Sequence, residues 1–164
     1  MTSSAEEPEP ELRPAARVIL LDAQGRILLF PWTLQDGRII WLTPGGGLAR
    51  GETHAQAALR ELREETGVED VALGPWVWRR EHVFTWSGRR LRQRERFFVV
   101  RVDTAEVDTS RWEAHEREAL GDGRWWTLEE LSGSDAEFAP RRLAELLAPL
   151  LNGRLPSRPV ETGV

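Results

Sequence analysis

Short apolar runs separated by turn-forming residues occupy much of the first hundred positions, a pattern typical of β-strands. The first run is followed by an Asp-Ala-Gln-Gly turn, and a Ser-Gly pair separates two longer runs further along the chain. The predicted strands cover residues 15–21, 26–30, 38–42, 71–73, 76–86, 91–102 and 123–127.

A helical pattern follows the glycine-rich segment 44–47. Thr53 is an N-cap candidate with Gln56 three residues later, which forms a capping box, and Gly67 suits the left-handed residue that ends a helix. At about 100° per residue, one side of this helix is apolar and is expected to face a core. The residues on that side are Ala55, Ala58, Leu59 and Leu62. A short helix at 128–131 and an amphipathic helix at 139–151 are also predicted.

The first helix carries Glu61, Glu64 and Glu65 on a side next to its apolar face. Like charges at these spacings repel by roughly 0.2–0.5 kcal/mol per pair, so the placement is unfavourable for folding alone. A hard divalent cation would turn the repulsion into ligation, because such ions take carboxylate and carbonyl oxygens. A solvated acidic helix face is the alternative, and the residues alone leave both open.

The chain of 164 residues suits one domain with a sizeable core. Strands interleaved with helices predict an α/β fold in which helices cover both faces of a mixed sheet. Residues 1–13 are acidic and contain proline, so we expect a disordered tail before a domain at 14–151. Residues 152–164 are expected to be a flexible C-terminal tail.

Composition narrows the classes of function. The net charge of −5 does not favour nucleic acid or an anionic membrane as partner. The chain has no cysteine, which excludes disulfides, thiolate zinc sites and cysteine nucleophiles. No signal peptide and no apolar run of membrane-spanning length is present, so a cytoplasmic location is expected.

The segment from Gly46 to Val68 resembles the signature of the Nudix hydrolase family, G-x5-E-x7-R-E-U-x-E-E-x-G-U, where U is aliphatic. Its nine fixed positions are filled without a gap by Gly46, Glu52, Arg60, Glu61, Leu62, Glu64, Glu65, Gly67 and Val68. The resemblance implies an α/β/α sandwich around a central mixed sheet, which agrees with the strand and helix pattern.

The resemblance also implies hydrolysis of a nucleoside diphosphate derivative that depends on Mg²⁺ or Mn²⁺. Glu61 matches the position expected for the general base, and Glu64 and Glu65 match direct metal ligands, although these roles move within the family. Gly45 would add its backbone carbonyl to the metal. Arg60 matches a position in the catalytic machinery, and we interpret it mainly as orienting the carboxylates through ion pairs.

Two features lie beside the signature. Many relatives carry a glutamate where this chain has Ala49, which removes one outer carboxylate. A further metal ligand often comes from a late loop, and Glu118 is the first candidate there, ahead of Glu116 and Glu113. Glu95 is a separate possibility, since a strand can aim it at the site.

The substrate is left open. The short sequence tags of several Nudix subgroups are missing: Phe84 stands where a proline marks ADP-ribose hydrolases, and Thr85 and Trp86 stand where a tyrosine marks dinucleoside-polyphosphate hydrolases. Trp41, Phe84 and Trp86 are candidates for stacking on a nucleotide base, against the alternative of core packing. The three histidines show no metal-ligand spacing and receive no role.

Four arginines alternate along and just before the strand at 91–102 and share a face, where they protect a sheet edge or meet phosphates or a partner subunit. They are Arg90, Arg92, Arg94 and Arg96. A homodimer through sheet edges or this hairpin is one hypothesis. The rival to an enzyme is a Nudix-like domain that senses nucleotides without turnover, whereas an isoprenoid diphosphate isomerase would need a cysteine.

Overall fold

The computed structural model describes residues 6–110 and 121–164. In this part of the chain, the strands are β1 (Glu11–Leu21), β2 (Ile27–Thr33), β3 (Ile39–Leu42), β4 (Gly45–Gly47), β5 (Trp76–Trp86), β6 (Arg89–Arg101), β7 (Arg124–Trp126), β8 (Glu137–Ala139) and β9 (Val160–Glu161). The helices are α1 (His54–Thr66), α2 (Leu128–Gly133) and α3 (Leu143–Leu151), with a 3-10 turn η1 at Thr104–Glu106.

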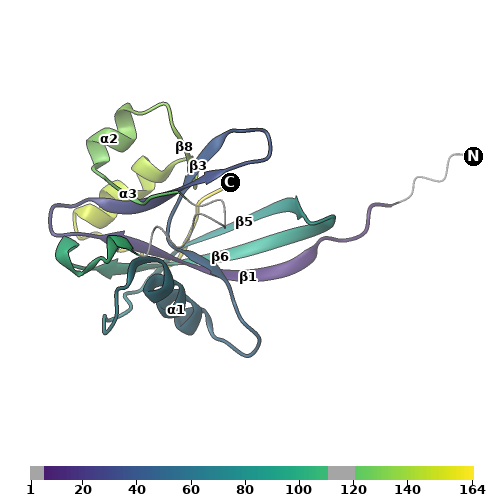
Figure 1. Cartoon of the computed structure of the whole chain (residues 1–164), viewed down its shortest axis with the longest axis horizontal. Helices are drawn as coiled ribbons and strands as arrows, with labels where there is room; N and C mark the ends of the chain where they lie inside the picture. The colour runs from purple at the N-terminus through teal and green to yellow at the C-terminus, as the bar shows by residue number, and fades with distance from the viewer. Residues whose placement is uncertain (1–5, 111–120) are drawn as a thin grey trace, which may run out of the picture.

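The strands form one mixed sheet in the order β8-β3-β2-β1-β6-β5-β9, with β4 paired to β1 and β7 paired to β2. The long β1 and β6 run parallel, with Arg17 opposite Phe97, and β5 pairs antiparallel with β6. Figure 1 shows α1 on one side of this sheet and α2 and α3 on the other. The mixed sheet with helices on both faces confirms the predicted α/β sandwich.

The two cores follow from the alternation of side chains along β1. Ile19 and Leu21 point toward α2 and α3, whereas Val18 and Leu20 point toward α1. Trp78 is completely enclosed in the first core. No described helix has the length and apolar character needed to cross a lipid bilayer.

Several elements differ from the sequence expectation. β1 begins at Glu11, inside the predicted N-terminal tail, and β9 lies inside the predicted C-terminal tail. β9 pairs with Trp78 and Arg79 of β5, and Thr162 after it is buried. These pairings join segments that are far apart in the sequence, so no local sequence pattern predicts them. β8 was not predicted, 71–73 forms no strand, and the last helix begins at Leu143 instead of 139.

The arginine row does not lie on a sheet edge, contrary to the expectation, because β6 lies between β1 and β5. The row is therefore one face of an interior strand. Arg92 and Arg94 form ion pairs with Glu81 of β5, and Arg96 lies over the ring of Trp76. Dimerisation through this hairpin stays a prediction.

The buried side of α1 is rotated from the expected one. Ala57, Ala58 and Leu62 are buried, whereas Ala55 is exposed and Leu59 is 37% exposed. The expectation grouped residues by helical angle alone, and the crossing of α1 over β1 and β4 sets which part of the helix circumference is covered.

This rotation gives a direct stability test. We expect Leu62→Ala to lower the free energy of unfolding by about 2–5 kcal/mol, because it empties a buried site. Leu59→Ala, one turn away on the same helix, removes a side chain that is already partly exposed and is expected to cost only about 1 kcal/mol. Urea unfolding of both variants measures the difference, and equal losses would contradict the observed orientation of α1.

Candidate active site

The glycine segment lies between β1 and α1, where it forms β4. Gly45 pairs with Arg17 in antiparallel register. Gly45 has a φ of 144°, and a Cβ there would lie 2.2 Å from the carbonyl oxygen of Ala16. A Cβ on Gly46 would lie 2.7 Å from Oε1 of Glu61. Only glycine allows the backbone to approach β1 and the helix this closely.

The helix carries its carboxylates to this backbone. The capping box between Thr53 and Gln56 is present, and Gly67 adopts the left-handed conformation that ends α1, as predicted. Glu65 is buried, and its Oε2 accepts a hydrogen bond from the backbone N–H of Gly45 at 3.1 Å. Glu61 lies next to Gly46, whereas the side chain of Glu64 is 52% exposed.

Arg60 connects the carboxylates along the helix. Its Nε donates to Glu52 at 2.8 Å, and its two terminal nitrogens donate to Glu61 at 3.0 Å and to the carbonyl oxygen of Gly47 at 3.2 Å. A weaker ion pair joins it to Glu64 at 3.5 Å. Arg60 thus contacts all three carboxylates, and its role in orienting them at a metal site stays a prediction.

Glu52 also accepts a hydrogen bond from Ala49, the residue that departs from the family pattern. The backbone N–H of Ala49 donates to Glu52 Oε1 at 2.9 Å. The hydrogen bond from Arg60, together with this backbone bond, lowers the pKa of Glu52 to about 2. The Ala49 position thus supports Glu52 through its backbone.

The acidic cluster is suited to a divalent cation. Burial, and then the nearby charge of Glu61, raise the pKa of Glu65 well above its ordinary value. A divalent cation would relieve this cost, because hard cations accept carboxylate and carbonyl oxygens. Within the described residues, no three carboxylate or imidazole side chains are grouped closely enough to hold a metal ion. Arg60 pairs with Glu61, and the side chain of Glu64 is largely exposed.

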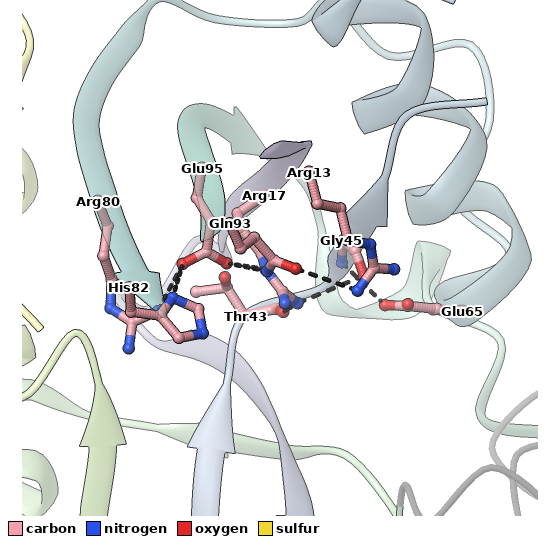
Figure 2. A network of polar contacts seen from close by, with 9 residues as sticks. All are labelled: Arg13, Arg17, Thr43, Gly45, Glu65, Arg80, His82, Gln93 and Glu95. Carbon is pink, nitrogen blue, oxygen red and sulfur yellow. Dashed lines mark hydrogen bonds and ion pairs between the residues drawn. The ribbon is translucent and has the colours of Figure 1, made fainter. Parts of the chain in front are cut away.

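A second polar network lies beside Gly45 on the opposite face of the sheet from α1 (Figure 2). At its centre is Glu95 of β6, which is buried. Oε2 of Glu95 accepts from Arg17 at 2.6 Å and from Gln93 at 3.2 Å, and Oε1 accepts from Arg80 at 2.6 Å. Both carboxylate oxygens are therefore occupied by protein donors, which argues against Glu95 as a direct metal ligand.

The charges around Glu95 decide its ionisation. Burial acts to raise its pKa, but the positive charges and hydrogen bonds of Arg17 and Arg80 outweigh burial and lower the pKa to about 2. The same carboxylate raises the pKa of Arg17 against the opposing effect of burial. Glu95 and Arg17 thus form a buried pair of opposite charges at neutral pH.

His82 extends this network along β5. Its Nδ1 lies 2.8 Å from a terminal nitrogen of Arg80 and its ring stacks on Phe84 with 5.1 Å between centroids. Burial, and then the charge of Arg80, lower the pKa of His82 to about 4, so the ring is neutral at pH 7. Because a guanidinium only donates, Nδ1 accepts and the ring hydrogen is on Nε2.

The three aromatic candidates for substrate stacking have different surroundings. Trp41 packs edge-to-face on Trp126 with 5.0 Å between ring centroids, at the margin of the core under α2 and α3. Phe84 is half-buried beside His82, and Trp86 is 61% exposed at the hairpin end. Trp86 is six residues beyond Arg80, which is about 20 Å along a strand. Phe84 therefore contacts the network directly, through its stacking on His82.

Three of the predicted site residues lie outside the described part of the chain, and two residues of the polar network were not predicted. Glu118, Glu116 and Glu113 fall outside the described residues. The sequence suggested no role for Arg17 and Arg80. The polar residues that alternate along β5 and β6 were the available signal of a buried polar cluster. The partner of Arg17 became clear only from the parallel pairing of β1 with β6, and that of Arg80 from the antiparallel pairing of β5 with β6.

A sequence model of the NUDIX domain matches residues 11–148, nearly the whole described domain. The chain belongs to the Nudix family. An RNA pyrophosphohydrolase of Novosphingobium aromaticivorans is 31% identical over 139 residues, which cover 79% of this chain and 86% of that protein. The putative mutator protein MutT4 of Mycobacterium tuberculosis is 31% identical over 116 residues, or 71% of this chain and 44% of that one.

Solved structures agree on the Nudix fold. The MutT protein of Methanosarcina mazei Go1 superimposes with a TM-score of 0.62 at 18% identity, covering 90% of this chain and 97% of that chain. The segment that carries the Nudix signature is the one that forms β4 and α1 here. The predicted family is therefore confirmed by sequence and by fold.

The Glu95 network predicts an acid-dependent stability. Because the folded-state pKa of Glu95 is depressed from 4.5 to about 2, its ionisation stabilises the fold above pH 4.5 by up to about 3 kcal/mol. That contribution is lost as the pH falls toward 2. Glu95→Gln is less stable than wild type at pH 7, and we expect the gap to narrow below pH 4.5 in urea unfolding.

Glu81→Gln is the matched control for this measurement, since Glu81 lies on the neighbouring strand and pairs with exposed arginines. Exposed pairs contribute at most about 1 kcal/mol, so this variant should follow the wild-type pH profile. A gap between wild type and Glu95→Gln that stays constant from pH 7 to pH 2 would contradict the depressed pKa.

Proposed function

We propose that this protein is a Nudix pyrophosphohydrolase that uses Mg²⁺ or Mn²⁺ to cleave the diphosphate linkage of a nucleoside diphosphate derivative. The observation that carries the proposal is the meeting of Glu61, Glu65 and the Gly45 backbone at the junction of β4 and α1. The complete signature and the relatives named as pyrophosphohydrolases support it.

Each residue of the candidate site has its own proposed role in the reaction. Glu64, Glu65 and the carbonyl of Gly45 would hold the cation, and Arg60 would keep the carboxylates oriented. When bound, the ion supplies charge neutralisation on the phosphate oxygens and a water that is more acidic than bulk water. Glu61, next to Gly46 and paired with Arg60, would accept the proton of the attacking water as its oxygen bonds to phosphorus. The bond from that phosphorus to the bridging oxygen breaks, and the other phosphate leaves with the bridging oxygen.

The substrate is proposed only as a class: a nucleoside triphosphate, a nucleotide sugar, ADP-ribose or a similar small molecule. RNA with a 5′-triphosphate is the second candidate, because the relative from Novosphingobium aromaticivorans is named an RNA pyrophosphohydrolase. The exposed arginines on β6 offer positive charge for a polyanion, although much of it is already paired with glutamates. The net charge of −5 favours the small molecules.

A substrate panel tests the proposal. Purified protein with Mg²⁺ or Mn²⁺ is given each nucleotide class and 5′-triphosphorylated RNA, and released phosphate, pyrophosphate and nucleotide are quantified. We expect cleavage of at least one substrate and a fall in kcat of about 10²–10⁴ for Glu61→Gln, because the proton acceptor is lost. Glu64→Gln, which removes a proposed metal ligand, should also be strongly impaired.

Glu129→Gln is the matched surface control, since Glu129 is exposed on α2, and it should keep wild-type activity. No release from any substrate with either metal would contradict the enzymatic proposal. Tight binding of intact nucleotide with metal and without cleavage, seen by calorimetry, would instead favour the rival nucleotide-sensing domain.

A further inference from the structure

Arg17 connects the buried Glu95 to the backbone of the glycine segment. Its Nε donates to Glu95 Oε2 at 2.6 Å, while one terminal nitrogen donates to the carbonyl oxygens of Thr43 at 3.1 Å and Gly45 at 3.3 Å. The side chain is 14% exposed. Figure 2 shows these groups in one continuous line from Arg80 through Glu95 and Arg17 to Gly45 and Glu65.

The peptide groups of Gly45 are consequently held from two sides. Glu65 of α1 accepts from the Gly45 N–H, and Arg17 of β1 donates to the Gly45 carbonyl. Glycine at this position has the conformational freedom to turn its peptide groups, and its φ of 144° is one that other residues rarely adopt. The orientation of the carbonyl thus depends on its hydrogen-bond partners as well as on strand pairing.

We propose that Arg17, fixed by Glu95, is a positioning residue that sets the Gly45 carbonyl for cation coordination. The inference rests on the proposed function, because it takes Gly45 as a metal ligand. A carbonyl oxygen has two lone pairs, so the bond to Arg17 leaves one for a cation. Neither Arg17 nor Glu95 touches the cation in this proposal.

The carboxylate of Glu95 explains how an arginine can serve beside a cation site. An unpaired guanidinium next to the Gly45 carbonyl would repel a divalent ion, since like charges at a few ångströms interact strongly in a partly buried site. The close ion pair with Glu95 cancels much of that charge. Glu95 therefore both holds Arg17 in place and lowers its repulsion of the metal.

Mn²⁺ affinity without nucleotide tests this inference on the full-length protein. Free Mn²⁺ is followed by electron paramagnetic resonance during a titration of wild type, Arg17→Met, Arg17→Lys and Glu95→Gln. We expect each variant to bind Mn²⁺ about 10–100-fold more weakly, the usual effect of losing a group that orients a metal ligand. Lysine keeps the charge but lacks the planar donor set that reaches Glu95 and two carbonyls.

Asp22→Asn is the matched control. Asp22 is a buried carboxylate that pairs with Arg26 at 2.7 Å, and it lies five residues beyond Arg17, about 17 Å along the extended chain. Its loss is expected to lower thermal stability in the same way as Glu95→Gln and to leave Mn²⁺ affinity at the wild-type value. Should Arg17→Met fail to fold, Arg17→Lys, which conserves volume and charge, carries the comparison.

The outcomes separate this inference from the proposed function. Unchanged or tighter Mn²⁺ binding in the Arg17 variants would overturn the positioning role, because repulsion would then be the main effect of Arg17. An equal loss of affinity in Asp22→Asn would overturn it as well, and so would a wild-type protein that binds no Mn²⁺. A wild type that binds Mn²⁺ but hydrolyses nothing removes the proposed function and leaves the positioning result standing.

Discussion

The close approach of a glycine backbone to a strand on one side and a helix on the other is the constraint on which the rest of the site depends. A Cβ on Gly45 would collide with Ala16, and one on Gly46 would collide with Glu61. Because these glycines have no side chain, the carboxylates of α1 reach the backbone directly, and Glu65 accepts a hydrogen bond from the backbone N–H of Gly45. The acidic helix is thereby joined to the sheet through polar contacts as well as through its apolar face.

The sheet supplies the second support. The parallel pairing of β1 with β6 places Arg17 near Glu95, and the pairing of β6 with β5 places Arg80 opposite Glu95. Buried charges of this kind are costly unless they are paired, and removal of one partner typically destabilises a protein by about 3–5 kcal/mol. The network therefore favours one register of these three strands, and that register brings Arg17 to the Gly45 carbonyl.

The parts that local sequence determines were predictable. The capping box, the terminating Gly67 and the three glutamates on one side of α1 all depend on residues within a few positions of each other, and the helix and its acidic side follow from them. The Nudix signature lies in this same segment. Its physical basis is local, because the glycine turn and the helix together form most of the proposed metal site.

The long-range parts were not predictable in the same way. Arg17 and Glu95 are 78 positions apart, and no local sequence pattern around either residue indicates that the other is its partner. The buried side of α1 was placed wrongly at Ala55 and Leu59, since the helix angle fixes which residues share a side but not which side faces the sheet. The short β8 and β9 pair with β3 and β5, which are distant from them in the sequence.

The location of a bound cation tests the account most directly. A crystal of the wild-type protein soaked in Mn²⁺ can be measured at the manganese absorption edge, where an anomalous difference map shows the ion independently of the protein coordinates. The account predicts a peak within coordination distance of the Gly45 carbonyl oxygen and of the carboxylates of Glu64 and Glu65, beside Glu61. A manganese peak elsewhere, or a site that excludes Gly45 and these glutamates, would contradict it.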